Sequence, residues 1–271
     1  MSSLERLLTV LDVFSEEKPI WTIEDVAATL GYPKSTVYRY VKELRDSRLL
    51  LSVGRSGYIL GPRIIELDRQ IQACDPLLTI GKRILPQLAN EAGEGIVLLC
   101  SLYGDAVLCI DSWSNLPSLS VSYTRGRPMP LFRGSASKVI LAHLPTRRLM
   151  KIFDQYAAMI REAGLGDDWD SFKRNLHGIR EKPFYATGSE IDKGIFAVSA
   201  PIFGDKRILA SLTFAMPDKR CSERTVAKIA ERVVARSADI GESLSRLVRN
   251  KPTIARTSRP SRPRRADAGK T

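Results

Sequence analysis

A run of polar and charged side chains directly after Pro33 has the composition of a base-reading surface. Nine residues hold two lysines, an arginine, a serine, a threonine and a tyrosine that share one side of a helix or flank it: Lys34, Ser35, Thr36, Tyr38, Arg39 and Lys42. Such groups match the donors and acceptors on base-pair edges in the major groove, which is wide enough for an α-helix. The run predicts contact with DNA; the alternative is a solvated helix face.

The donors need a helix that is anchored on its other side, and the flanking sequence predicts one. Thr22 is predicted to cap a short helix over residues 23–30, which Gly31 ends in a left-handed conformation before Pro33 restarts the chain. A third helix over about residues 34–48 follows, and the donors fall on its outer side. Its inner side is predicted to hold Val37, Val41, Leu44, Arg48 and, at the margin, Tyr40.

Two more segments complete a small N-terminal module. A first amphipathic helix is predicted from apolar residues spaced by three and four: Leu4, Leu7, Leu8, Leu11 and Phe14. After the third helix, two apolar runs flank a Gly-Arg-Ser-Gly turn, which predicts a hairpin. Arg55 at its tip is a candidate for contact with phosphate or the minor groove, or is merely exposed. Three helices and a hairpin over residues 1–61 predict a winged helix-turn-helix. Because one such helix reads few base pairs, DNA binding predicts a dimer.

The remaining chain predicts a linker, one larger domain and a tail. A helix beginning at Pro62 is expected to link the domains over residues 62–75. Residues 76–250 combine strands joined by tight turns with several helices, which predicts an α+β domain with a mainly antiparallel sheet. The strands are expected at residues 95–103, 106–113, 119–123, 194–203 and 208–216, and the helices near 77–92, 135–143, 146–156, 170–180 and 222–249. Residues 251–271, rich in Arg, Pro and Ser, predict a disordered basic tail.

The charge distribution favours an anionic partner. The net charge of the 271 residues is +12, and the tail contributes +6 of it through seven basic residues against one Asp. Residues 34–63 hold seven basic residues against two acidic ones, so the predicted recognition helix and wing are locally basic. The tail is expected to add affinity that is independent of sequence. Binding of RNA rather than DNA stays an open alternative.

The remaining composition argues against a metal centre, export or membrane insertion. The four cysteines form no C-x-x-C pair, and with two histidines in the chain no zinc-binding spacing can be assembled. Scattered thiols suit a reducing compartment. The N-terminus has no basic leader or cleavage site, and no apolar run approaches the roughly 18 residues that span a bilayer. We expect a soluble cytoplasmic protein without a cofactor.

Residues 135–138 admit two interpretations, catalysis and ligand binding. Ser135 and Lys138 match the S-x-x-K pattern, in which the Lys deprotonates a nucleophilic Ser, so a hydrolase is the alternative function. The same pattern occurs at Ser15–Lys18, and the companion motifs of that enzyme class are absent. No nucleophile elbow, P-loop, dinucleotide fingerprint or H-E-x-x-H is found. We therefore expect no enzyme. A helix beginning at Ser135 can instead hold a carboxylate with its free N–H groups and positive dipole end.

Taken jointly, the motifs resemble the IclR family of bacterial transcription regulators over about residues 4–250. Four features of this sequence resemble the DNA-binding half of the family: a glycine before the recognition helix, the start of that helix, an arginine within it and the end of the wing. They are Gly31, Lys34-Ser35-Thr36, Arg39 and Tyr58-Ile59-Leu60-Gly61. Its effector-binding half is similar to "RGRPMPLFRGSASKVILAHLP" and to "GIFAVSAPIFGDKRILASLTFAMP".

This resemblance implies a GAF-like sensor domain that binds a small metabolite, often a carboxylic acid, in a homodimer or homotetramer. By motif position, the family's ligand contacts fall on Ser135, Ala136, Thr187, Ala197, Thr213 and Ala215. The family's small-acid sensors can carry Asp, Cys and Ser at the last four positions and Gly at the first. We therefore expect a less polar pocket and a larger or more apolar acid, such as an aromatic one. Trp113, Met129 and Phe132 are candidates for its lining or for ordinary core. Ala197, Thr213 and Ala215 can equally be core residues of a sheet.

Overall fold

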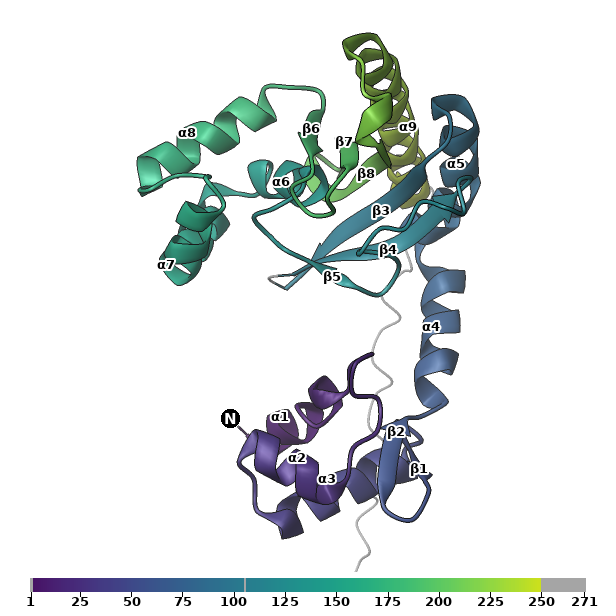
Figure 1. Ribbon diagram of the computed structural model, residues 1–271, viewed down its shortest axis with the longest axis vertical. Helices are drawn as coiled ribbons and strands as arrows, with labels where there is room; N and C mark the ends of the chain where they lie inside the picture. The colour runs from purple at the N-terminus through teal and green to yellow at the C-terminus, as the bar shows by residue number, and fades with distance from the viewer. Residues whose placement is uncertain (1, 105, 250–271) are drawn as a thin grey trace, which may run out of the picture. The chain divides into compact units, whose positions relative to one another are not determined.

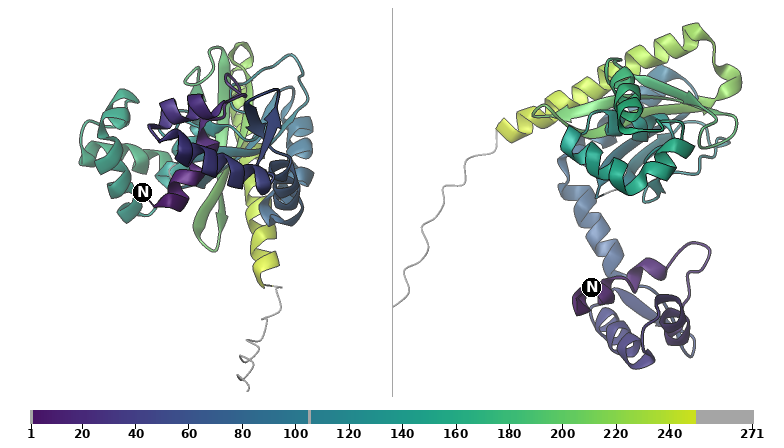
Figure 2. Two further views of the ribbon diagram at one scale, coloured as in Figure 1. Left: turned by 90° about the horizontal axis from the view of Figure 1, so that it is seen from below. Right: turned by 90° about the vertical axis from the view of Figure 1, so that its left-hand side faces the viewer.

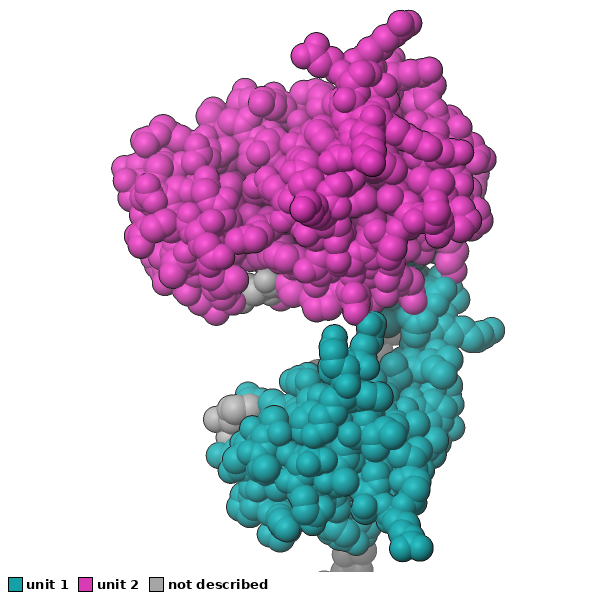
Figure 3. All heavy atoms as spheres, viewed as in Figure 1, with its two compact units in different colours: residues 1–79 teal, residues 80–271 magenta. Residues whose placement is uncertain are grey.

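The computed structural model describes residues 2–104 and 106–249, and two compact units divide the chain between residues 79 and 80 (Figure 3). Each unit has its own hydrophobic core and is treated separately. The predicted tail, residues 251–271, lies outside the described residues, and the predicted domain limits at residues 61 and 75 stay predictions. Within the described ranges, no helix has the length and apolar character needed to cross a bilayer.

The first unit consists of short helices and a two-stranded hairpin (Figure 1). Trp21 pairs with Tyr58 of the hairpin through two backbone hydrogen bonds of 3.0 and 2.8 Å, so the hairpin gains an isolated antiparallel bridge. In chain order the elements are α1 (Ser3–Leu8), η1 (Leu11–Val13), α2 (Ile23–Leu30), α3 (Lys34–Asp46), β1 (Leu50–Val53), β2 (Gly57–Leu60) and α4 (Arg63–Cys74).

The turn between α2 and α3 follows from three residues, as the sequence predicted. Thr22 caps α2 in a reciprocal box, because its Oγ1 accepts from the Asp25 N–H at 3.1 Å and the Asp25 carboxylate accepts from its backbone N–H. Gly31 ends α2 in the left-handed conformation with φ of 68°, and Pro33 is the N-cap of α3.

The cap of α2 depends on ionised Asp25. The hydrogen bonds from Thr22, and then the charge of Lys18, hold the pKa of Asp25 below its usual value of 3.8. A lowered folded pKa means that this contribution to stability is complete above the unfolded pKa and is lost as the pH falls through the folded one.

Two expectations for the first unit are wrong. The first helix is split, because Thr9 and Val10 leave it and the Thr9 hydroxyl donates back to the Arg6 carbonyl at 2.8 Å. As a result Leu4 is 75% exposed and Leu8 is also exposed, whereas Val10 is fully buried. Helix α3 ends at Asp46, and Arg48 lies beyond it with φ of 63°, exposed and paired with Glu66 at 3.1 Å rather than packed inward.

The second unit is an antiparallel sheet with helices on both faces (Figures 1 and 2). The strand order is β5-β4-β3-β8-β7-β6, and every neighbouring pair is antiparallel, which confirms the predicted α+β class. In chain order its elements are α5 (Pro76–Ala92, which begins in the first unit), β3 (Ile96–Tyr103), β4 (Ala106–Ser114), β5 (Pro128–Met129), α6 (Ser135–Ala142), α7 (Thr146–Glu162), α8 (Trp169–Arg180), β6 (Tyr185–Gly188), β7 (Ile195–Gly204), β8 (Arg207–Pro217), η2 (Asp218–Arg220) and α9 (Glu223–Arg249).

The strand register decides which residues face α6. Leu98, Thr213 and Ser199 are directly opposite one another on β3, β8 and β7, and this row faces α6, since Ser199 bonds to a serine of that helix. The next residue along each strand faces the other way because side chains alternate. On that opposite face lie α5 and α9 (Figure 2). Arg236 of α9 donates to the Glu91 carboxylate of α5 and so joins the two helices.

The sequence prediction differs from the structure at three strands, one that does not form and two that it misses. Residues 119–123 form no strand, because the Ser122 N–H donates to the Asp192 carboxylate at 3.0 Å instead of pairing with the sheet. The edge strand is β5, and it consists of Pro128 and Met129 alone. The other edge strand, β6, is absent from the prediction because "YATG" is short and shows no apolar alternation.

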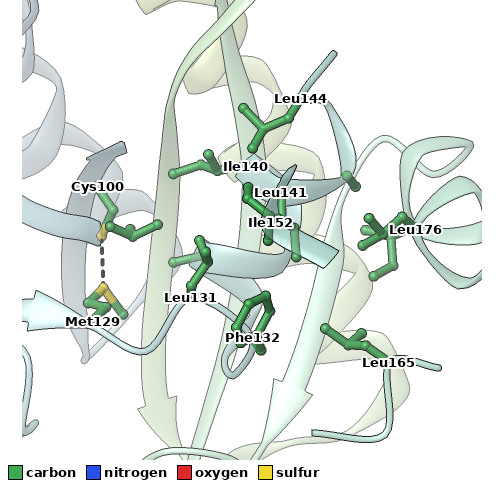
Figure 4. Close-up of a cluster of buried hydrophobic side chains, with 14 of the residues drawn as sticks. Cys100, Met129, Leu131, Phe132, Ile140, Leu141, Leu144, Ile152, Leu165 and Leu176 are labelled. Carbon is green, nitrogen blue, oxygen red and sulfur yellow. Dashed lines mark hydrogen bonds between the residues drawn. The ribbon is translucent and has the colours of Figure 1, made fainter. Parts of the chain in front are cut away.

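A large hydrophobic core fills the space between the sheet and α6 to α8 (Figure 4). All eight residues of α6 are buried, including the polar Ser135, Ser137 and Lys138. The thiol of Cys100 lies 3.5 Å from the sulfur of Met129, and Cys109 is directly opposite Cys100 in the register. Both cysteines are buried free thiols, and the contact with Cys109, followed by burial, raises the pKa of Cys100. Helix α6 therefore has no solvent-facing side.

The α2 cap gives a first test. Replacing Thr22 by Ala removes the acceptor for the Asp25 N–H, and we expect a loss of about 1 kcal/mol of local stability, equivalent to about fivefold faster amide exchange in α2 and α3. Hydrogen exchange read by mass spectrometry on the full chain measures it.

The matched control is Ser2→Ala, which removes the same kind of capping box from α1, a helix without buried residues. Its effect on exchange in α2 and α3 is expected to be small. An equal effect of both substitutions would mean that the Thr22 cap has no special part in holding α2.

Candidate functional site

Helix α3 has two different faces, as expected from its spacing. Its inner face buries Val37, Tyr40, Val41 and Leu44 in the core of the first unit. On the outer side the predicted contact residues are exposed, with Tyr38 at 60%, except for Thr36, which is half-buried. The exposed members of this set are Lys34, Ser35, Tyr38, Arg39 and Lys42. Since the helix is anchored by its inner face, these side chains are presented outward at fixed positions.

The charges on this outer face have few internal partners. The first turn of α3 has no acidic residue, and Lys34 makes only an exposed pair with Glu24 at 3.5 Å. Such exposed pairs are weak. Within residues 2–104 and 106–249, Arg39, Lys42 and Arg55 form no ion pair. A cationic helix start with exposed basic side chains suits an anionic ligand.

The hairpin holds Arg55 in the same unit as α3. Its turn connects β1 and β2, and Leu50 at the start of β1 is buried against the helices in the core of this unit. The bridge between Trp21 and Tyr58 stiffens the other strand. All seven predicted contact residues therefore lie on one compact unit, and their role in binding stays a prediction.

In the second unit, the six predicted ligand contacts surround one cavity. The space measures about 460 Å³ together with its mouth, and its lining includes Ser135, Ala136, Thr187, Ala197, Thr213 and Ala215. They meet because Thr187, Ala197 and Ala215 are opposite one another across β6, β7 and β8 on the face toward α6. Apolar side chains complete the wall: Leu98, Val121, Met129 and Ile195. An apolar wall with a few polar groups is typical of a small-molecule site.

A row of hydroxyl groups lies beside this cavity, and three of its members, Ser135, Thr187 and Thr213, line the space. The Ser135 and Ser199 oxygens are 2.7 Å apart, and Ser199 and Thr213 are likewise 2.7 Å apart. The Thr187 hydroxyl accepts from the Ser135 N–H at 3.2 Å. Because each hydroxyl can either donate or accept, this row can adapt to a polar group on a ligand.

One residue next to the cavity was not found from the sequence, namely Glu190. It belongs to the segment Ser189–Gly194 between β6 and β7, hereafter the strap. Its carboxylate accepts from the Gly134 N–H at 2.8 Å and from the Lys138 ammonium at 2.8 Å through both oxygens. The Lys138 side chain is only 6% exposed. Burial, and then the charge of Glu190, raises the pKa of nearby Tyr185.

The expected free anion site at the start of α6 is therefore wrong in part. The Gly134 N–H is bonded to Glu190 and the Ser135 N–H to Thr187, so two of the donors expected for a ligand already have partners. No local pattern signals this, because Glu190 is 52 residues from Lys138 in the sequence.

The strap also carries Asp192, which lines the cavity and holds a loop in place. Its carboxylate accepts from the N–H and the hydroxyl of Ser122, so residues 121–123 stay at the cavity instead of entering the sheet. Of the three large apolar candidates, Met129 lines the cavity. Trp113 is exposed, and Phe132 packs in the core against Tyr156.

The geometry does not assemble a Ser–Lys catalytic pair. The Lys138 ammonium is held by Glu190, and the Ser135 hydroxyl is bonded to Ser199. A general base must reach the proton that it abstracts. At the other S-x-x-K match, the Lys18 ammonium lies 3.8 Å from the Trp21 ring centroid, and the Ser15 hydroxyl accepts the Lys18 backbone N–H.

Comparison with known proteins finds two family models that match the chain. The family model described as "Bacterial transcriptional regulator IclR C-terminal" matches residues 73–242, and the "IclR helix-turn-helix domain" matches residues 3–53. The HTH-type transcriptional regulator TtgV of Pseudomonas putida is 29% identical over 203 residues, 74% of this chain and 75% of that protein.

Solved structures share the fold of the chain. An IclR transcriptional regulator from Alicyclobacillus acidocaldarius gives a TM-score of 0.72 at 20% identity, over 89% of this chain and 98% of that one. An IclR homologue from Microbacterium hydrocarbonoxydans, complexed with 4-hydroxybenzoate, gives 0.72 at 20% identity, over 90% and 99%.

A glycine at the start of α6 gives a second test. Gly134 has φ of 78°, and a Cβ there would lie 2.4 Å from the Ile191 Cδ1 of the strap. We expect Gly134→Ala to destabilise the second unit by about 1–3 kcal/mol, through backbone strain and displacement of the strap. Urea unfolding followed by circular dichroism measures the loss.

Gly178→Ala provides the control in the same unit. Gly178 lies in α8 with open space at its Cβ position, so this substitution is expected to be neutral or to stabilise by up to about 1 kcal/mol. If Gly134→Ala were equally well tolerated, the strap would not depend on close contact with residue 134.

Proposed function

The chain belongs to the IclR family of bacterial transcription regulators, and on this basis we propose that its first unit binds an operator in double-stranded DNA under the control of a small molecule bound in its second unit. The relatives are named as transcription regulators, so the family is one of DNA-binding proteins rather than enzymes. The observation that carries the DNA part is the two-faced helix α3.

In the proposed complex α3 enters the major groove. Its N-terminal turns would address base edges with Lys34, Ser35, Thr36 and Arg39, since a recognition helix reads with its N-terminal residues. Tyr38, Lys42 and Arg55 would contact the backbone and fix the register of the protein on the duplex. In support, these side chains are outward-facing on one anchored unit with a locally basic sequence.

The small molecule is proposed to bind in the cavity beside α6. Support comes from the position of all six predicted contacts around one mostly apolar space, and from the relative that is complexed with 4-hydroxybenzoate. Binding there would change operator affinity, and reciprocity then requires the operator to change ligand affinity by the same factor.

We further propose that the protein acts as a homodimer or homotetramer. Helix α4 supports this, because it is amphipathic yet buries none of its residues within one chain. Ile64, Leu67 and Ile71 are exposed at spacings of three and four residues, so they share one side of the helix, and apolar side chains exposed together mark interaction surfaces. A second copy of α4 is the proposed partner for this face.

Arg39 tests the DNA-binding role. With an operator selected from random duplex DNA, Arg39→Ala is expected to weaken operator binding by about 1–3 kcal/mol and to change binding to random duplex little. Gel shift at fixed salt, with duplex RNA as a competitor, measures both affinities and separates DNA from RNA binding.

The charge-matched control is Arg147→Ala on α7, where an exposed arginine lies far in sequence from the recognition helix. It is expected to leave both affinities unchanged. Equal weakening of operator and random DNA by Arg39→Ala would make Arg39 a phosphate contact, and no weakening at all would remove α3 from the interface.

Filling the cavity tests the control by a small molecule. Ala197→Phe places a ring among residues that line the space, so we expect loss of ligand binding by calorimetry and loss of the ligand's effect on operator binding. Operator affinity without ligand should stay close to the wild-type value. Ala158→Phe, at an exposed position on α7, is the control and should respond like wild type. A normal ligand response in Ala197→Phe would place the effector elsewhere.

A further inference from the structure

The cavity wall carries negative charges without a facing positive charge. Glu190 and Asp192 both line the space, and none of the described residues that line it is Lys, Arg or His. The Lys138 ammonium lies behind Glu190, which uses both carboxylate oxygens to bind it. The charge of Glu190 is thus offset by Lys138, but a ligand anion would meet the Asp192 carboxylate and no basic side chain among the described lining residues.

Glu190 already occupies the place at which a ligand carboxylate would bind. Two of the donors there are the Gly134 N–H and the Lys138 ammonium, and both bond to Glu190 at 2.8 Å. The next N–H, that of Ser135, is bonded to Thr187. An acid would have to displace the protein's own carboxylate before it could use the same groups.

Displacing Glu190 is costly because the strap is held at three successive residues. Without Glu190, Lys138 would be a buried charge without a partner, which is strongly destabilising. The side chain of Ile191 is seated against Gly134, and Asp192 is bonded to the N–H and hydroxyl of Ser122. Movement of Glu190 would therefore disturb its two neighbours as well.

An uncharged ligand meets none of these obstacles. The hydroxyls of Ser135, Thr187 and Thr213 belong to residues that line the cavity and can donate to, or accept from, a hydroxyl or amide group. Leu98 and Met129 supply an apolar wall for the body of the molecule. The cavity thus offers neutral polar contacts and a hydrophobic surface, but no counter-charge.

We propose that the cavity takes an uncharged, largely apolar molecule bearing a hydroxyl or amide group, and that Glu190 is the residue that excludes carboxylates. This inference rests on the proposed effector site and replaces the acid expected from the sequence with a neutral ligand. Glu190 acts by occupying the anion position, and Asp192 reinforces the exclusion by its charge.

The test uses pairs of probes that differ in charge but hardly in shape. The pairs are benzamide and benzoate, 4-hydroxybenzamide and 4-hydroxybenzoate, and cyclohexanecarboxamide and cyclohexanecarboxylate, titrated into the full chain by calorimetry at neutral pH. For the wild type we expect each amide that binds to do so at least about tenfold more tightly than its acid.

In Glu190→Gln the preference for amides is expected to be lost. The Lys138 ammonium then has no carboxylate partner and becomes available, so acids should gain about tenfold or more while amides change less than about threefold. Glu162→Gln is the matched control, since Glu162 pairs with Arg133 on an exposed surface away from the cavity lining. It should bind both sets of probes as the wild type does.

A double substitution guards against a folding defect caused by unpaired Lys138. Lys138→Met with Glu190→Gln removes both charges, and we expect amides to bind as in the wild type and acids to stay weak. Acids that bind the wild type as tightly as amides, or that do not gain in Glu190→Gln, would overturn the inference while leaving the effector site intact. If no probe of either kind binds the wild type, the effector site itself fails, and this inference fails with it.

Discussion

A buried ammonium group constrains the second unit more than any other single feature. Helix α6 has no face toward solvent, and yet it carries Lys138, so a carboxylate must reach it from another part of the chain. Glu190 does so from the strap, and its position fixes the two residues that follow it. Ile191 then seats against Gly134 and Asp192 ties down the loop at Ser122. The position of the strap beside the cavity thus follows from the need to neutralise the charge of Lys138.

In the first unit the main constraint is how a small core holds helix α3. Because this core is small, α3 is held in place only if one whole side of the helix is apolar and buried, and that side includes Val37, Val41 and Leu44. What remains is a face that can be polar without destabilising the unit, because nothing in the core depends on it. The proposed DNA contacts therefore lie on the side of α3 that does not pack in the core. In the second unit the proposed ligand site is a cavity that the core side chains do not fill.

Local signals made much of this fold predictable, and long-range contacts explain the errors. Thr22, Gly31 and Pro33 act within a few residues of themselves, so α2 and α3 follow from the sequence. Residues 119–123 alternate like a strand, yet their backbone is captured by Asp192, some 70 residues later. The predicted cavity residues came from the family resemblance and share a face through the register of the sheet. Glu190 had no such signal, since neither its neighbours nor its spacing reveals a partner 52 residues away.

The bridge between Trp21 and Tyr58 has a consequence for how the first unit forms during synthesis. The two residues are separated by both helices of the turn, so Trp21 has no backbone partner until the hairpin has left the ribosome. Closing such a loop is entropically unfavourable unless the intervening chain is already compact. Helices α2 and α3 should therefore pack on each other first, and the hairpin should then close onto a preformed edge. The wing is in this sense the last part of the first unit to be completed on the nascent chain.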